Sequence, residues 1–395
     1  MKYPFLRFPA VLVLSLLFAE PTFAGMREKT ARTDSLRKQA VNLSRQGRIE
    51  QSNAVFRDLL DNYTLSRKDR RTIWDWMSQN ALLSGDYSSF CELYTLLGRA
   101  VPEVYQKMAT FPHQTMERGC ADVVIDFKVD TAQVYGSTNE GHIRIPVTIN
   151  GNDEWFILDN GCANVCAIKE SDATRFGIHM VDIGPSIHGS MGGTSSSRIG
   201  FADSLSVGGL VFRNLYFAVI PDEAMNLPVT EPVAILGSNF IRLAGEMQFL
   251  VRDRRIVFPF KQQERGSNIV FNKEDEHFID VVYQEDTLRF KLDIGAVSTQ
   301  LNGRYYKRHK NRIRSLSSKI TNTHYGAGGA KEISVYLVEN AEFQACGGTF
   351  VKPITEIATE QTEQWDMTFG NLGCDFLLSF DQVCLNLQKG YLYVE

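Results

Sequence analysis

The sequence predicts a mostly β protein built from two similar lobes, preceded by a small α-helical domain. From about residue 119, apolar and polar side chains alternate in short runs joined by Gly- and Asn-containing turns, as in strands and hairpins. Several short motifs in that region occur twice, in the same order and with nearly the same number of residues between the two copies. Residues 26–110 instead carry apolar side chains at helical spacing.

The composition is that of an ordinary globular protein, with 44% hydrophobic and 22% charged residues in a chain of 395. This length is enough for two or three domains. The net charge of −4 argues against nucleic acid as the main partner.

Residues 1–24 have the layout of an export signal. Lys2 and Arg7 precede an apolar run at 10–19, and Ala24 is a small residue at a plausible cleavage site. An uncleaved anchor is the alternative, but the run is shorter than the ~20 residues that span a bilayer. We expect a secreted or periplasmic protein with no membrane span after signal cleavage.

The next segment, 25–118, is expected to be a helical domain. Residues 40–60 recur loosely as 79–97, with a period of 38 residues, and each unit resembles a tetratricopeptide helix hairpin. An unrelated helical bundle fits the pattern equally well. Two such units are fewer than a solenoid needs for stability, so we expect this segment to dock on the rest of the chain. It could act as a prosegment or recruit a protein partner.

A second and longer repeat divides the remainder into lobes at 119–262 and 263–395. "WFILDNGCANVCAI" (155–168) matches "RFKLDIGAVSTQL" (289–301), which places Asp159 and Asp293 134 residues apart. His188 and His324, and then Gly237 and Gly373, follow at separations of 136 residues. These three pairs of residues follow in the same order, and the two members of each pair are separated by nearly the same number of residues. This indicates a duplicated β lobe.

Each lobe delivers an aspartate from an apolar strand to a glycine turn. A carboxylate in such a place is costly to desolvate unless it has a partner. Two carboxylates about 3 Å apart cannot both ionise, so the pair holds one shared proton. The ionised member can then take a proton from water while the protonated member polarises a carbonyl.

These motifs resemble the aspartic proteases of the pepsin and retropepsin kind, over about 119–395. The resemblance implies two pepsin- or retropepsin-like β-barrel lobes and an aspartic-type endopeptidase that acts on peptides or proteins without a metal or a cofactor. Asp159 and Asp293 would form the catalytic dyad, Gly161 and Gly295 would let the two loops approach, and "AILG" and "GNLG" would support the loops. The resemblance also implies flap hairpins over the cleft. Their candidate tip residues are Gly189, Met191, Gly192, Tyr325 and Gly326.

The sequence departs from the family pattern in both loops. Asn160 and Ile294 stand where the family has Thr or Ser, and Cys162 stands where it usually has Ala or Ser. An amide can still donate and accept hydrogen bonds, whereas an isoleucine cannot. We therefore expect Asn160 to reach across to backbone near Asp293, and Ile294 to pack among apolar side chains.

Other functions remain open at this point. The same fold could bind an extended peptide as an added strand without any catalysis by the two aspartates. Alternatively, the protein could be an adaptor that binds its partners through the helical segment. A thiol nucleophile at Cys162 or Cys166 is a weaker hypothesis than a packed or disulfide-bonded role. The chain has seven cysteines, so at least one thiol is unpaired.

Overall fold

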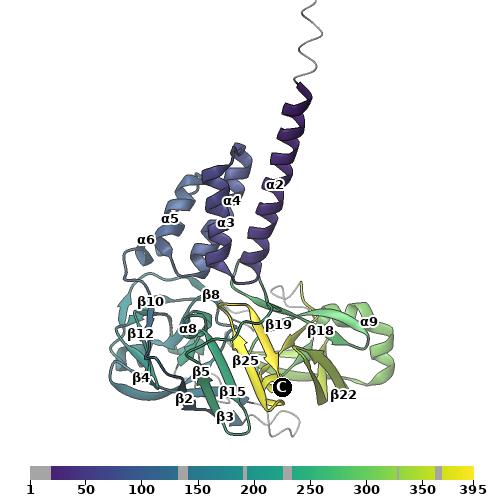
Figure 1. Ribbon diagram of the computed structural model, residues 1–395. Helices are drawn as coiled ribbons and strands as arrows, with labels where there is room; N and C mark the ends of the chain where they lie inside the picture. The colour runs from purple at the N-terminus through teal and green to yellow at the C-terminus, as the bar shows by residue number, and fades with distance from the viewer. Residues whose placement is uncertain (1–18, 132–140, 190–193, 226–233, 327–328, 361–366) are drawn as a thin grey trace, which may run out of the picture.

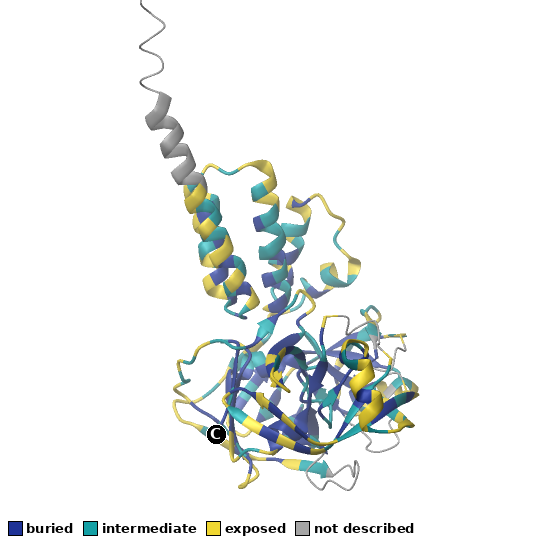
Figure 2. Cartoon of the chain, turned by 90° about the vertical axis from the view of Figure 1, so that its right-hand side faces the viewer, coloured by how far each residue is buried: buried dark blue, intermediate teal, exposed yellow. Residues whose placement is uncertain are grey.

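The computed structural model describes residues 19–131, 141–189, 194–225, 234–326, 329–360 and 367–395. The chain is mostly β, with two large curled sheets and a group of helices formed by the N-terminal part (Figure 1). This is the fold class that the sequence predicts. Figure 2 shows that the buried residues are concentrated inside the β region, while the helices carry many exposed positions.

The N-terminal part forms successive helices joined by short turns. They are α2 (Ala19–Arg45), α3 (Ile49–Asn62), α4 (Arg67–Leu83), α5 (Tyr87–Leu96) and α6 (Glu103–Met108). Gly47 and Gly85 close the turns after α2 and α4 with φ of +73° and +71°, a conformation that favours glycine. Most of the expected export signal, residues 1–18, lies outside the described residues. None of the helices described is both long enough and apolar enough to cross a membrane.

A buried amide ties the helices together. Asn80 of α4 accepts a hydrogen bond from Ser44 Oγ at 2.6 Å and donates to Ser52 Oγ at 3.0 Å, which links α4 to α2 and α3. Since all three side chains are buried, each needs such a partner. The network holds the helix hairpins in one arrangement.

The helices dock on the β region, as the sequence leads us to expect. Tyr87 and Met108 pack with Ile199 and Tyr216 of the first sheet in one buried cluster. At the other end, Lys273 lies 3.5 Å from the carboxylate of Asp75 in α4. The helical segment therefore contacts both halves of the β region.

The first curled sheet is built from residues 115–236. Its strand order is β1-β12-β11-β4-β5-β14-β6-β13-β10-β7, with β3 added beside β4. The strands are β1 (Thr115–Glu117), β3 (Lys128–Thr131), β4 (Gly141–Ile149), β5 (Asn152–Leu158), β6 (Cys166–Lys169), β7 (His179–Val181), β10 (Arg198–Ala202), β11 (Leu205–Val207), β12 (Leu210–Arg213), β13 (Leu215–Ile220) and β14 (Ala234–Leu236). The segments α7 (Glu170–Arg175), η1 (Asp222–Met225) and α8 (Ser238–Ala244), and the small sheet of β8 (Ser186–His188) and β9 (Thr194–Ser196), complete this part.

The second curled sheet has the order β17-β18-β19-β24-β20-β23-β22-β21. Its strands are β17 (Val270–Phe271), β18 (His277–Tyr283), β19 (Asp286–Leu292), β20 (Gln300–Leu301), β21 (Lys319–Gly326), β22 (Gly329–Ala345), β23 (Gly348–Ala358) and β24 (Gly370–Leu372). The short helix α10 (Cys374–Leu378) follows β24.

This region also contains α9 (Gly303–Leu316), in which two helical segments meet at a kink at His309. The Asn302 side chain caps it by accepting from the backbone N–H groups of Arg304 and Tyr305. Tyr306, before the kink, and Ile313, after it, are both buried. In the sequence, the basic residues of this segment mask its buried apolar positions.

A third sheet joins the two halves of the β region. Its order is β2-β16-β15-β25-β26, and its strands are β2 (Val123–Asp126), β15 (Glu246–Leu250), β16 (Arg255–Phe258), β25 (Gln382–Asn386) and β26 (Tyr391–Val394). β15 pairs antiparallel with β25, from Glu246 opposite Asn386 to Leu250 opposite Gln382. Strands 136 residues apart in the chain, counted from Glu246 to Gln382, therefore share one hydrogen-bonded ladder, which lies centrally below the helices in Figure 1.

Candidate active site

The two Asp-x-Gly loops leave matching strands of the two curled sheets. Asp159 follows β5, and Asp293 follows β19. β5 pairs in parallel with β14, and β19 pairs in parallel with β24. The backbone N–H of Asp159 donates to Leu236 O and that of Asp293 donates to Leu372 O, both at 3.0 Å. The strands of "AILG" and "GNLG" thus hold the two aspartates in the same way.

Gly237 and Gly373 lie directly against the loops that these strands support. A Cβ on Gly237 would come within 1.8 Å of Val165 O, and one on Gly373 within 2.7 Å of the Ser298 carbonyl carbon. The next residue in each case donates its backbone N–H into the loop, Ser238 to Cys162 O at 2.9 Å and Cys374 to Ala296 O at 2.7 Å. Only glycine leaves room for this close approach of backbone to backbone.

The two loops face each other, and each glycine packs on the carboxyl group of the opposite loop. A Cβ on Gly161 would lie 2.6 Å from Asp293 Oδ1, and one on Gly295 would lie 2.0 Å from Asp159 Cγ. Within each loop the aspartate accepts from the glycine backbone, at 2.7 Å for Gly161 N and 3.1 Å for Gly295 N. The structure therefore brings Asp159, Asp293, Gly161 and Gly295 together at one place between the lobes.

Asn160 makes the connection across the junction. Its Oδ1 accepts from Ile294 N at 2.7 Å, and its Nδ2 donates to Leu292 O at 2.8 Å. Ile294 is fully buried in the apolar core. The polar cross-link is therefore asymmetric, as the sequence led us to expect, because one loop supplies an amide and the other supplies backbone groups only.

The electrostatics of the pair favour one shared proton. Burial, together with the neighbouring Asp293 charge, raises the pKa of Asp159 to about 7. The Lys291 Nζ lies 3.8 Å from Asp293 Oδ2. The raised pKa favours the protonated form of Asp159, as in a pair of carboxyl groups that shares one proton.

Comparison with known proteins adds to this geometry. Residues 145–240 match a family model described as aspartyl protease. This part of the chain is similar to aspartyl proteases. The match runs from β4 into α8 and includes Asp159, but it ends before Asp293.

A search of solved structures found a retropepsin-like aspartic protease from Rickettsia conorii, which is 16% identical to this chain. The similarity covers 37% of this chain and 95% of that one, with a TM-score of 0.23. No curated protein matches the chain.

Two further side chains flank the aspartates, and our sequence analysis did not name them. Lys291 is one of them, and it lies in β19, two residues before Asp293. Side chains two residues apart in extended backbone point to the same face, so the alternation of side chains along the strand could have predicted this contact. His142 of β4 is the other, and its ring is hydrogen-bonded to the Gly295 backbone. Burial, and then the charge of Arg144, lower the pKa of His142, which favours the neutral ring. No local pattern could have found His142, because its contact depends on the packing of distant strands.

The cysteines near the loops are thiols. All seven cysteines of the chain are free in the structure, so the disulfide alternative for Cys162 and Cys166 is wrong here. Burial, and then the charge of Asp159, raise the pKa of Cys162 well above its ordinary value. A protonated thiol is a poor nucleophile, so the geometry favours a packing role for Cys162.

The flap candidates are only partly described. Met191 and Gly192 lie outside the described residues, and Gly189 directly follows β8. Tyr325 and Gly326 end β21, which forms a hairpin with β22, and Tyr325 is 48% exposed. Their action as flaps stays a prediction.

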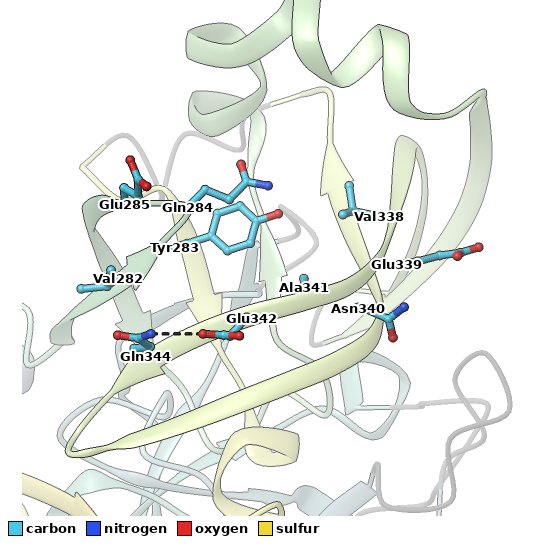
Figure 3. Close-up of a pocket in the computed structure, with 10 residues that line it drawn as sticks. All are labelled: Val282, Tyr283, Gln284, Glu285, Val338, Glu339, Asn340, Ala341, Glu342 and Gln344. Carbon is cyan, nitrogen blue, oxygen red and sulfur yellow. Dashed lines mark hydrogen bonds between the residues drawn. The ribbon is translucent and has the colours of Figure 1, made fainter.

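A pocket of about 510 Å³ lies elsewhere on the second lobe (Figure 3). It is lined by the turn after β18 and by the middle of β22, where Asn340 has a φ of +50°. None of its lining residues belongs to the two Asp-x-Gly loops. Within the described part of the chain, no group of three or more His, Cys, Asp or Glu side chains is placed to hold a metal ion.

Proposed function

We propose that this chain is an aspartic-type endopeptidase that hydrolyses peptide bonds with water activated between Asp159 and Asp293. The observation that carries the proposal is the packing of Gly161 and Gly295 on the opposite aspartates, which brings two carboxyl groups together on matching loops. The match of residues 145–240 to aspartyl proteases supports the same class.

The proposed reaction begins with the pair singly protonated. The Asp293 carboxylate takes a proton from water while the water oxygen attacks the peptide carbonyl carbon, and Asp159 gives its proton to the carbonyl oxygen. The resulting tetrahedral diol collapses as Asp293 protonates the amide nitrogen and Asp159 takes back a hydroxyl proton. The C–N bond then breaks, and the pair returns to its starting protonation state.

The test is cleavage of a mixed peptide library between pH 3 and 7, with pepstatin as an inhibitor control. We expect Asp159→Asn and Asp293→Asn each to lower the cleavage rate by about 10³-fold or more, because both carboxyl groups serve one mechanism. Asp182→Asn is the matched control, since the Asp182 side chain is 92% exposed and lies outside the two loops. Cleavage by either loop variant at the rate of the control would refute the proposal.

We also propose that residues 1–24 are an export signal, so that the enzyme acts in a secreted or periplasmic location. The arrangement of Lys2, Arg7 and the apolar run at 10–19 supports this. The intact mass of the exported protein should correspond to a chain that begins at Gly25. A full-length chain in the cytoplasm would contradict it.

A further inference from the structure

A series of buried polar side chains connects the first Asp-x-Gly loop with the turn between β17 and β18. Asp275 lies in this turn and His277 begins β18; they are 0% and 1% exposed, and Asn160 of the first loop is 0% exposed. The Asn272 side chain shapes the turn by accepting from the backbone N–H of Glu274 at 3.0 Å and of Glu276 at 2.8 Å. Neither Asp275 nor His277 takes part in the proposed reaction. Because buried polar side chains are costly without partners, their presence here calls for a structural or functional explanation.

Asp275 is anchored on the first lobe. It accepts from Ser238 Oγ at 2.5 Å and from Asn164 N at 3.3 Å, and it forms an ion pair with Arg242 of α8. Burial opposes its ionisation, but the Arg242 charge and the hydrogen bonds of His277 and Ser238 outweigh this and lower the pKa of Asp275 to about 2. A fixed negative charge from the second half of the chain is therefore held against the first loop.

The hydrogen bonds of Asn160 determine which nitrogen of His277 carries its proton. Because Ile294 N can only donate, the atom of Asn160 that faces it must be the carbonyl oxygen. The other terminal atom is then Nδ2, which only donates, and it lies 3.0 Å from His277 Nδ1. Nδ1 must accept, so the neutral ring carries its hydrogen on Nε2, which lies 3.5 Å from Asp275 Oδ1.

We propose that His277 is a positioning residue for the aspartate pair: its Nδ1 fixes the amide of Asn160, and this amide holds the two loops in register. The proposal rests on the peptidase function proposed above. It explains how one amide can serve a junction in which Ile294 offers no polar side chain, since both N–H groups and the carbonyl oxygen of the amide have buried partners. Without the acceptor on His277, one N–H of Asn160 would be left buried and unsatisfied.

Two substitutions separate this role from simple packing. His277→Asn keeps an oxygen close to the position of Nδ1, so it can still accept from Asn160. His277→Gln moves its polar atoms outward to the position of Nε2, near Asp275, and leaves Asn160 without its partner. We expect kcat to fall about 10-fold or more in His277→Gln and less than about 3-fold in His277→Asn, with KM little changed in both, because the residue does not touch substrate.

The melting temperature of each variant is measured alongside the kinetics. Equal losses of kcat in the two variants, or no loss in either, would overturn the proposal while leaving the peptidase function standing if the wild-type chain cleaves peptide. A wild-type chain no more active than Asp159→Asn would instead remove the peptidase function, and the positioning role with it.

A spectroscopic readout does not depend on turnover. The ¹⁵N shifts of the His277 ring in the wild-type protein should show a protonated Nε2 and an unprotonated Nδ1 at neutral pH. The His277 signals can be assigned among the seven histidines by their absence from the His277→Gln spectrum. A ring protonated at Nδ1 would overturn the proposal whatever the activity.

Discussion

The side chain of Lys291 lies on the same face of β19 as Asp293, within 3.8 Å of its Oδ2. Burial opposes the charge of this lysine, but the carboxylates of Asp293, Glu276 and Asp159 outweigh it and raise the pKa of Lys291. The corresponding position in the first loop is Ile157, two residues before Asp159. The two otherwise matching loops therefore differ in charge beside the reacting groups.

The first residue-scale prediction concerns Lys291→Ile, which gives the second loop the residue of the first. Burial and Asp293 raise the pKa of Asp159 to about 7, and Lys291 works against that rise. Activity requires the proton on Asp159, so it falls as pH rises through this pKa. Removing Lys291 should raise the pKa further and move the falling limb of the kcat profile to higher pH by about one unit.

The measurement is the pH dependence of kcat for wild type and variant, with Lys307→Ile as the control. Lys307 is an exposed residue of α9, outside the candidate site. An unchanged profile in Lys291→Ile, or a shift to lower pH, would contradict this view of the charge arrangement.

The site residues differ in how far the sequence could predict them. Asp159, Gly161 and their counterparts stand in a short repeated motif, so local pattern was sufficient. The position of Lys291 beside Asp293 could have been predicted from the alternation of side chains along a strand. His277 was not, because its contact with Asn160 joins residues 117 apart in the chain and depends on how the turn after β17 packs.

At the scale of elements, the turn between α2 and α3 is a main point of contact between helices and sheets. Gly47 has a φ of +73°, and a Cβ there would lie 2.8 Å from the Phe271 ring of β17 and 3.0 Å from Leu387 O. Gly85, at the turn between α4 and α5, has a φ of +71° but only the flexible Gln114 side chain near it, at 3.1 Å. The two turns share a backbone conformation and differ in what they touch.

This pair allows a matched test of docking. Gly47→Ala and Gly85→Ala both carry the cost of a left-handed alanine, about 1–2 kcal/mol. Gly47→Ala should also push the helix hairpin off Phe271, so its melting temperature should fall at least about 2–4 °C further than that of Gly85→Ala. Limited proteolysis should release the helical segment earlier from Gly47→Ala. Equal melting temperatures and equal cleavage rates would show that the turn does not hold the helices to the sheets.

The elements were predictable where one periodicity dominated. The β pattern after residue 119 and the helical spacing before it both led to the observed secondary structure. α9 was missed because six Lys and Arg side chains surround its apolar stripe, although Asn302 gave a capping signal. The shared sheet could not be predicted, since the pairing of β15 with β25 joins strands that no local pattern relates.

At the scale of the whole molecule, that shared sheet makes the two lobes one structural unit. β2, β15 and β16 come from the first half of the β region, and β25 and β26 come from the second. The apolar core is likewise continuous, with buried residues from Ile125 to Val394 in a single cluster. Neither lobe can unfold without breaking this ladder and exposing the core of the other.

We therefore expect the two lobes to unfold in one transition. Calorimetry should give a calorimetric enthalpy equal to the van't Hoff enthalpy for the β region. In hydrogen exchange, amides of β5 and β19 should lose protection at the same denaturant concentration. Loss of protection in one strand well before the other would show that the lobes are independent.

The position of β25 and β26 in the chain also bears on when the protein acquires its activity. During synthesis, β15 emerges from the ribosome long before residues 382–394, which supply the strand that pairs with it. A nascent chain that lacks those residues contains both aspartates but lacks two strands, β25 and β26, of the sheet that joins the two halves of the β region. The proposed peptidase would thus stay inactive until residues 382–394 have been synthesised, and a product truncated before them would be unable to cleave proteins of the cell that makes it.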